Sequence, residues 1–290
     1  MSLGAAAFRP AILIMIFAAL FPRCLHADGI DTEHLFAFTI GTDVGDVGER
    51  EFQGQTTGRF SKTAGSYKAV NQEAELEFVP ANNLRVEVGS SYSWYGINGV
   101  PGLEDRSQFN WQGASLDLRY RLLDRRTAPV GLTFALETGA RQIDELTGAF
   151  ARNYAVDLTV AIERDLIPDR VVAALNLLYE PEWTRVLPTG LAEQESTGGV
   201  AAALMAQIRP GFLIGGETRY LRRYAGPGLD NFTGQAFFVG PTGYWQLSER
   251  AWINLAWSTQ LWGRSSGSSA ALDLVNFERN QARLIFGFNF

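Results

Sequence analysis

Apolar and polar residues alternate along most of the chain after residue 49. In residues 84–88, for example, leucine and valine take turns with arginine and glutamate. A period of two places successive side chains on opposite faces of a β-strand. The alternating segments span about 10 to 14 residues, which suits a tilted strand that crosses a membrane. The pattern therefore predicts long β-strands with one apolar face and one polar face.

Turn-forming segments divide this pattern into a series of predicted strands. The strands span 50–62, 67–79, 83–96, 108–122, 129–141, 151–164, 170–183, 197–209, 211–223, 233–247, 250–263 and 277–290. Short turns between them alternate with longer, glycine-rich loops, as outer-membrane barrels require and a soluble β-sandwich does not. We therefore predict an all-β fold, a transmembrane antiparallel up-and-down β-barrel of about twelve strands over residues 50–290.

Residues 1–27 have the features of a secretory signal peptide. An apolar run over residues 11–21 is too short to cross a bilayer as a helix. A small residue stands at Ala27, so we expect cleavage after it; an uncleaved anchor is the alternative. Proline and arginine precede Cys24, where a lipoprotein would have small residues. Because Cys24 is the single cysteine, the mature chain is expected to contain no disulfide.

The pattern leaves the role of residues 28–49 open. Leu35–Ile40 predicts a strand, and Gly41–Gly48 predicts a turn-rich hairpin. The segment is therefore interpreted as an N-terminal periplasmic segment or a partial plug of the barrel. A further strand, which would change the strand count, is the third alternative.

The last predicted strand carries the most specific motif. Its apolar face is formed by Ala282, Leu284, Phe286, Phe288 and Phe290. This face resembles the C-terminal β-signal of Gram-negative outer-membrane proteins, a broad class of porin-like barrels. The resemblance implies a bacterial outer-membrane location, contact with outer-membrane lipid, and recognition by the barrel-assembly machinery. It assigns the assembly signal to Leu284, Phe286, Phe288 and Phe290.

Aromatic residues gather near the predicted strand ends, as expected of belts at the two membrane interfaces. Beside the long loops they are Tyr92, Trp94, Tyr95, Trp111, Trp183, Tyr220, Tyr224 and Trp262. Beside the short turns they are Phe78, Tyr120, Phe212, Trp245, Trp252 and Phe290.

Charged residues are predicted to face the lumen, because a charge on the lipid face costs about 2–4 kcal/mol at the midplane. The lumen-lining candidates are Glu73, Glu75, Glu77, Arg85, Glu87, Asp117, Arg119, Arg121, Glu137, Arg141, Glu217, Arg219, Arg279 and Arg283. Two interpretations remain open. The charges pair across strands and fill a narrow lumen, or some stay unpaired and line a path for solutes.

Composition and motifs exclude several other functions. The net charge of −6 argues against nucleic-acid binding. His34 is the single histidine after the signal peptide, and it is far in sequence from any loop serine, so a Ser-His-acid enzyme site is not expected. No phosphate-binding, dinucleotide or metal motif appears, so we predict no catalytic residue, cofactor or metal. A narrow channel or transporter for small polar or charged solutes is therefore the favoured function. An occluded structural or surface-interaction barrel is the alternative, followed by an outer-membrane enzyme.

Overall fold

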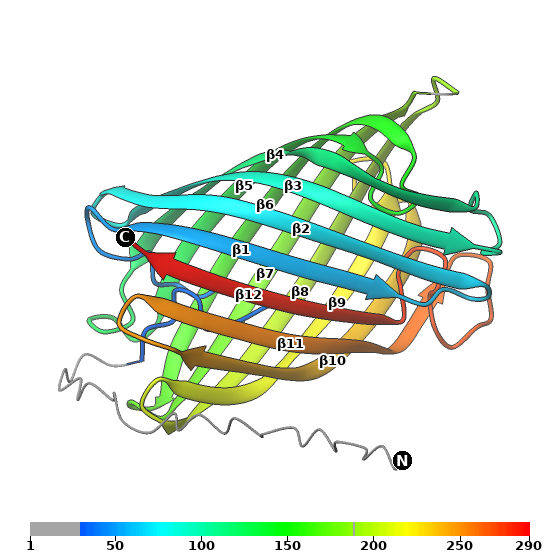
Figure 1. Ribbon diagram of the computed structural model, residues 1–290. Coiled ribbons are helices and arrows are strands. Elements are labelled where there is room, and N and C mark those ends of the chain that lie inside the picture. The colour runs from blue at the N-terminus through cyan, green and yellow to red at the C-terminus, as the bar shows by residue number, and fades with distance from the viewer. Residues whose placement is uncertain (1–29, 188) are drawn as a thin grey trace, which may run out of the picture.

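The computed structural model describes residues 30–187 and 189–290, so the predicted signal peptide and its cleavage site lie outside the described residues. The described residues form twelve antiparallel strands (Figure 1). The strands are β1 (Arg50–Phe60), β2 (Ser66–Ala81), β3 (Leu84–Asn98), β4 (Arg106–Leu123), β5 (Gly131–Ile143), β6 (Phe150–Ile167), β7 (Val171–Val186), β8 (Ala192–Arg209), β9 (Phe212–Ala225), β10 (Phe232–Gln246), β11 (Ala251–Ser265) and β12 (Asn280–Asn289).

Each strand pairs with its neighbours in the chain, and β1 pairs with β12, so the sheet closes into a barrel. The closing register runs from Glu51 opposite Asn289 to Phe60 opposite Asn280. The predicted fold class and strand number are therefore confirmed. Strand ends differ from the prediction, and β8 begins at Ala192 rather than at residue 197. Its polar first residues still pair with β7, because backbone hydrogen bonds do not depend on apolar side chains.

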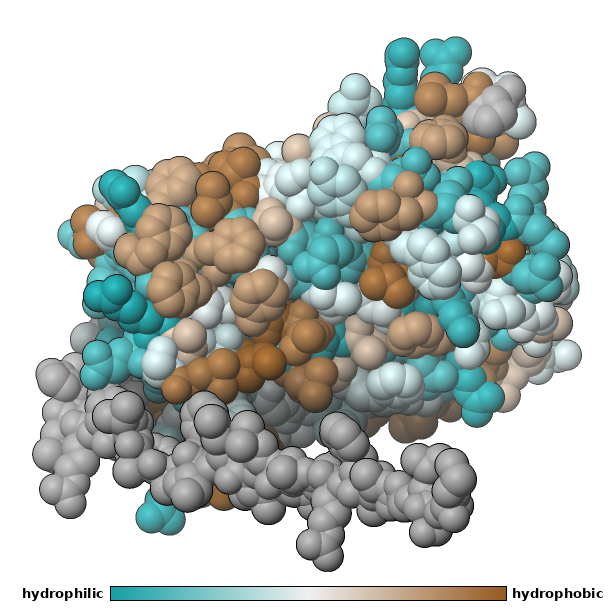
Figure 2. Space-filling model, in the orientation of Figure 1, coloured by the Kyte–Doolittle hydropathy of each residue, from teal (hydrophilic) through white to brown (hydrophobic). Residues whose placement is uncertain are grey.

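The outer wall of the barrel is apolar. Leu76, Phe134, Leu204 and Leu255 are each between 46% and 61% exposed on the outward faces of their strands. Figure 2 shows apolar residues gathered over the strands on the face in view. Exposed apolar residues in such numbers are suited to lipid rather than to water. Among the described residues, none belongs to a helix long and apolar enough to cross a membrane.

Two predicted belt aromatics lie inside the barrel instead. Tyr95 and Trp252 are buried on the inward faces of β3 and β11, so the belt prediction is wrong for them. The physical reason is that inward partners exist for their polar groups. Trp252 Nε1 donates to Glu51, and the Tyr95 hydroxyl donates to the carbonyl oxygen of Glu145. The other aromatic residues that are exposed, including Tyr92 and Trp245, fit the predicted belts.

A β-bulge interrupts the alternation in β4. Ser91 pairs with Gly113 and Tyr92 pairs with Trp111, which leaves Gln112 as the extra residue. Gln112 is buried and its side-chain oxygen accepts hydrogen bonds from Asn71 and Ser93. Because of the bulge, Gln112 stands on the inward side together with Gly113, and Trp111 keeps its place on the outer face.

Residues 30–49, which we call the inner segment, run through the barrel beside the short turns and near the C-terminal end of the chain (Figure 1). The predicted strand over Leu35–Ile40 is wrong, because no residue of the inner segment is in a strand. Its backbone N–H groups bond to side chains of the wall instead of to a neighbouring strand. Ala37 and Phe38 donate to Glu217, Ile40 donates to Asn176, and Thr42 donates to Glu163.

Apolar packing also holds the inner segment in place. Ile30, Leu35 and Phe36 pack against an inward apolar patch of Val172, Ala174, Ala203, Met205 and Leu213 on β7, β8 and β9. Burying a leucine or phenylalanine side chain contributes about 1.5–3 kcal/mol. The inward face of the barrel is therefore not uniformly polar, and its apolar part is covered by the inner segment.

Candidate lumen site

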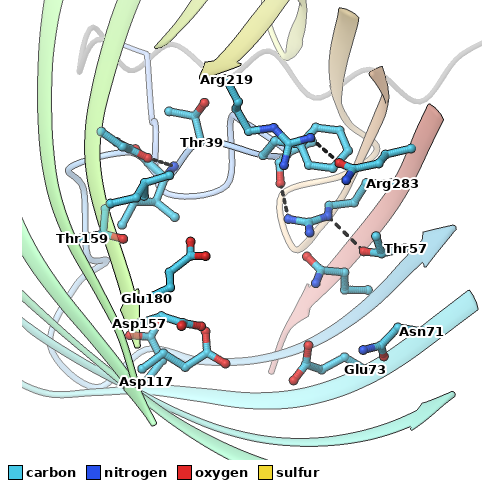
Figure 3. Close-up of a pocket in the computed structure, with 18 of the residues that line it drawn as sticks. Thr39, Thr57, Asn71, Glu73, Asp117, Asp157, Thr159, Glu180, Arg219 and Arg283 are labelled. Atoms are coloured by element: carbon cyan, nitrogen blue, oxygen red, sulfur yellow. Dashed lines mark hydrogen bonds between the residues drawn. The ribbon is translucent and has the colours of Figure 1, made fainter. Parts of the chain in front are cut away.

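A cavity of 460 Å³ lies in the lumen between the inner segment and the long loops. The inner segment borders it with Phe38 and Thr39. The opposite side is bordered by Glu145 of the β5–β6 loop and by Phe277 before β12. Charged side chains from at least seven strands reach this space, as the view in Figure 3 shows for several of them. The cavity is therefore the part of the lumen where a solute could meet the wall.

One wall of the cavity is acidic. It carries Glu73 and Glu75 from β2, Glu137 from β5, Asp157 from β6 and Glu180 from β7. None of these five carboxylates has a basic nitrogen within 4.0 Å among the described residues. Glu75 accepts a hydrogen bond from Gln53, and Glu73 accepts one from Ser115. The acidic wall is therefore hydrogen-bonded in part but not neutralised by direct ion pairs.

Arg219 and Arg283, which form the basic wall, lie across the cavity from Asp157 and Glu180, whereas Glu73 lies on the same side as Arg283 (Figure 3). In Figure 3, Arg219 lies near Thr39 and Arg283 lies near Thr57, and Asp117 is on the side of Asp157 and Glu180. The two guanidinium groups lie 4.0 and 4.6 Å from the centre of the Phe38 ring. Arg283 also donates to the Ala37 carbonyl oxygen at 2.8 Å. Stacking on an aromatic face orients a guanidinium without cancelling its charge, so the two walls face each other with opposite sign.

Nearer the short turns the inward charges are paired. Arg85 is 1% exposed and contacts Glu33 at 3.1 Å, Glu77 at 3.3 Å, and Glu87. Arg119 contacts Glu87 at 3.5 Å and Asp117 at 2.7 Å. This network therefore joins the inner segment, through Glu33, to β2, β3 and β4.

A second set of pairs holds the other end of the inner segment. Arg125 in the β4–β5 turn contacts Asp43 at 3.1 Å and Glu163 at 3.0 Å. Arg121 contacts the same Asp43 at 3.6 Å. Acids of the inner segment therefore meet arginines of the wall and of a turn, and both ends of the segment are fixed by charge.

At the long-loop side, Glu145 folds into the lumen. It contacts Arg59 at 2.6 Å and Arg141 at 3.1 Å. The Tyr67 hydroxyl donates to the carbonyl oxygen of Leu146. The Arg59 guanidinium is the main cause that lowers the pKa of Glu145 to about 2. These contacts hold the β5–β6 loop against the wall.

The structure places most of the predicted lumen residues in the cavity wall. Those that line it are Glu73, Glu75, Arg85, Glu87, Asp117, Arg119, Glu137, Arg141, Arg219 and Arg283. Glu77 and Glu217 are buried against the inner segment, and Arg121 reaches Asp43 near the turns. The lumen therefore contains both charges in ion pairs and charges without an ion pair among the described residues.

Arg279 is the exception among the predicted lumen residues. It is exposed and precedes β12, whereas the adjacent Glu278 is buried. The alternation cannot be extended to residue 279, because pairing of β12 with β1 starts only at Asn280. Its backbone N–H donates to Ser61 at the end of β1. The inward assignment of Arg279 is therefore wrong.

Several residues of the site were not recognised from the sequence. Gln53 and Thr57 line the cavity, and extending the inward alternation of β1 would have identified them. Phe38 and Glu145 line it too. They lie in segments without a strand period, so no pattern in the sequence indicated them.

Comparison with known proteins supports the fold. The COG4313 outer membrane channel from Pseudomonas putida F1 is similar over 86% of this chain and 98% of its own, with 12% identity and a TM-score of 0.61. The NanC porin is similar over 83% of this chain and 100% of its own, with 10% identity and a TM-score of 0.50. At such identity the likeness shows the outer-membrane barrel fold alone. No curated protein sequence matches this chain. A family model described as "Family of unknown function (DUF6662)" matches residues 28–290, so the chain belongs to that family.

Proposed function

We propose that this protein is a narrow channel of the bacterial outer membrane for small polar or charged solutes. The observation that carries the proposal is the lumen cavity with an acidic wall facing Arg219 and Arg283. Its volume of 460 Å³ is within the range of about 300–1,000 Å³ found for small-molecule sites. Direct ion pairs do not neutralise either wall, so both can interact with a passing solute.

The two walls favour solutes that carry charges of both signs. A molecule with a cationic and an anionic group can orient between Glu180 and Arg283, whereas a purely anionic or cationic solute meets one repulsive wall. Because charges inside a narrow lumen are weakly screened, this preference is expected to exceed that of an open aqueous pore. The two reported structures whose folds resemble this one are described as a channel and a porin, in agreement with transport.

An occluded barrel is the second candidate, and a separate observation favours it. The inner segment crosses the lumen and is held by ion pairs of Glu33 and Asp43 with Arg85 and Arg125. In this alternative the inner segment is a permanent plug. The barrel would then act as a structural or surface-interaction element through its long loops.

Conductance of the purified protein in planar bilayers separates the two candidates. For a channel we expect small open steps in the wild type. Glu137→Gln should shift ion selectivity toward anions, and Arg219→Gln should shift it toward cations. Glu249→Gln is the matched control, since Glu249 is exposed on a short turn outside the lumen. An absence of steps in the wild type at every voltage, together with steps after deletion of residues 31–44, would establish the plugged barrel instead.

A further inference from the structure

A cluster of buried ligand groups joins the inner segment to β1 and β2 at the edge of the cavity, and none of its residues belongs to the two charged walls that the proposed function uses. It consists of His34 and the carboxylates of Glu33, Glu51 and Glu77. His34 Nε2 lies 3.3 Å from Glu51 Oε1 and 3.9 Å from the nearest oxygens of Glu33 and Glu77. Ligand atoms of Glu33, His34 and Glu77 all lie within 4.8 Å of one another.

The imidazole of His34 is held in a defined orientation. It stacks on the Trp252 ring with 4.3 Å between centroids and 12° between planes. Trp252 Nε1 in turn donates to Glu51 Oε2 at 2.8 Å, which leaves Glu51 Oε1 directed at His34. One residue therefore positions both the nitrogen and one carboxylate of the cluster, as supporting residues do around metal ligands.

Buried carboxylate oxygens in this cluster have no hydrogen-bond donor. Among the described residues, Glu51 Oε1 and both side-chain oxygens of Glu77 accept no hydrogen bond, and of the two Glu77 oxygens only Oε2 has an ion-pair contact, with Arg85 Nε at 3.3 Å. The side chains of Glu51 and Glu77 are 1% and 2% exposed, so bulk water does not solvate them. A buried polar group without a partner costs about 1–3 kcal/mol, and a charged one costs more. A bound cation would satisfy Glu51 Oε1 and Glu77 Oε1, and it would add a contact to Glu77 Oε2 beside that of Arg85.

The local charge also favours a cation. Around Arg85 and Arg119, the two basic groups of this network, stand the carboxylates of Glu33, Glu51, Glu77, Glu87 and Asp117. Arg85 contacts one oxygen each of Glu33 and Glu77. Carboxylates that bind a metal are commonly also hydrogen-bonded by such a neighbour. The guanidinium groups therefore leave an excess of negative charge next to His34.

We propose that Glu33, His34 and Glu77, with Glu51 as a fourth ligand, bind a divalent transition-metal ion such as Zn²⁺. Imidazole nitrogen combined with carboxylate oxygen is a ligand set that suits Zn²⁺ and its first-row neighbours better than Ca²⁺ or Mg²⁺. Metal–ligand bonds of about 2.0–2.2 Å in a tetrahedral site separate ligand atoms by roughly 3.3–3.5 Å. Glu51 already lies at that distance from His34 Nε2, and Glu33 and Glu77 need to approach this nitrogen by roughly half an ångström. The ligand atoms of Glu33 and Glu77 lie within 4.8 Å of each other, so these two carboxylates also have to close on one another when the metal binds.

The metal would join the inner segment to the barrel wall. Glu33 and His34 belong to the inner segment, whereas Glu51 lies on β1 and Glu77 on β2. Binding of Zn²⁺ therefore stabilises the position of the inner segment. We therefore expect Zn²⁺ to lower the conductance of the wild type. This expectation rests on the proposed channel function, but metal binding itself does not.

The experiment titrates the metal-free protein, purified in detergent without a histidine tag, with Zn²⁺ in a calorimeter. We expect one Zn²⁺ per chain in the wild type, and affinity at least tenfold weaker in His34→Asn and in Glu51→Gln. Co²⁺ should show d–d absorption in the wild type that is lost in His34→Asn. Glu182→Gln, which removes a lumen carboxylate outside the cluster, is the matched control and should bind as the wild type does.

Zn²⁺ binding that is equal in the wild type, His34→Asn and Glu51→Gln would overturn the site, as would an equal loss in Glu182→Gln. Two variants of the cluster are used so that one remains informative if the other fails to fold. A folded variant is recognised by the heat-dependent shift in its gel migration. If Zn²⁺ binds as expected and the wild type never conducts, the channel proposal fails and the metal site stands. If the wild type conducts and Zn²⁺ does not bind, the metal site fails and the channel proposal stands.

Discussion

Inward charges of this barrel differ from one another in how fully they are paired. Arg85 is 1% exposed and touches three carboxylates, whereas Glu137 lines the cavity and has no basic nitrogen within 4.0 Å among the described residues. Pairing of a buried charge matters because removing one partner leaves the other charge uncompensated. Removing a charge that faces the cavity is expected to cost less stability, and to change the passage of ions more, than removing a paired buried charge.

Arg85→Gln and Glu137→Gln should therefore behave differently. Arg85→Gln leaves Glu33 and Glu77 without their arginine and Glu87 with Arg119 alone, and we expect a loss of about 3–5 kcal/mol in the free energy of unfolding. Glu137→Gln removes repulsion from a carboxylate-rich wall, so stability should change by less than about 1 kcal/mol. Urea unfolding in lipid vesicles, followed by tryptophan fluorescence, measures both. Equal losses in the two variants would mean that the pairing seen around Arg85 does not contribute to stability.

At the scale of elements, loops and the inner segment narrow a barrel whose strands alone would leave a wider lumen. The β5–β6 loop is the clearest case, because Glu145 inserts between Arg59 and Arg141. The pKa of Glu145 is lowered to about 2, so its carboxylate is more stable in the folded state than in the unfolded one. This contribution is complete above the ordinary pKa of a glutamate, about 4.3, and is lost as pH falls through about 2.

The Arg59→Gln variant should release the β5–β6 loop at a higher pH than the wild type does. Arg59 is the largest cause of the lowered pKa, so without it Glu145 takes up a proton closer to the ordinary glutamate value. At about pH 3 we expect pepsin to cleave this loop in the variant and to spare it in the wild type. Arg106→Gln is the control, since its partner Glu104 is 87% exposed and belongs to another loop. Identical cleavage of all three proteins would show that Glu145 does not hold the loop.

At the scale of the whole molecule, closure depends on the pairing of β1 with β12. Phe286 and Phe288 stand outside on β12, and Phe290 follows the strand and donates its N–H to Arg50 at the start of β1. Every strand in the described barrel has two neighbours, so no edge is left unpaired. The role of Leu284, Phe286, Phe288 and Phe290 as an assembly signal stays a prediction.

Closure and assembly can be measured together on gels. The wild type should migrate differently before and after boiling in SDS, because a closed barrel resists the detergent until it is heated. Phe290→Ala should lower the amount of this folded form in the outer-membrane fraction by several-fold and leave protein in the periplasm. Leu261→Ala removes an exposed apolar residue of β11 and should assemble normally. Normal assembly of Phe290→Ala would contradict the proposed signal, and equal migration of boiled and unboiled wild type would contradict a closed barrel in solution.

The sequence by itself determined the strand number, the barrel class and the inward direction of most charges. These features follow from a local rule, since each strand needs an apolar face toward lipid and therefore alternates with a period of two. The rule fails where strand pairing stops or slips. It misplaced Arg279, which precedes β12, and it could not show the bulge at Gln112.

Only the tertiary structure decided the path of the inner segment and the partners of the inward charges. Leu35–Ile40 has the composition of a strand, but all barrel edges are already paired, so its backbone bonds to wall side chains such as Glu217 instead. Ala37 and Glu217 are 180 residues apart in sequence. Contacts of this kind depend on the closed barrel bringing distant strands around one lumen, and no local period of the sequence encodes them.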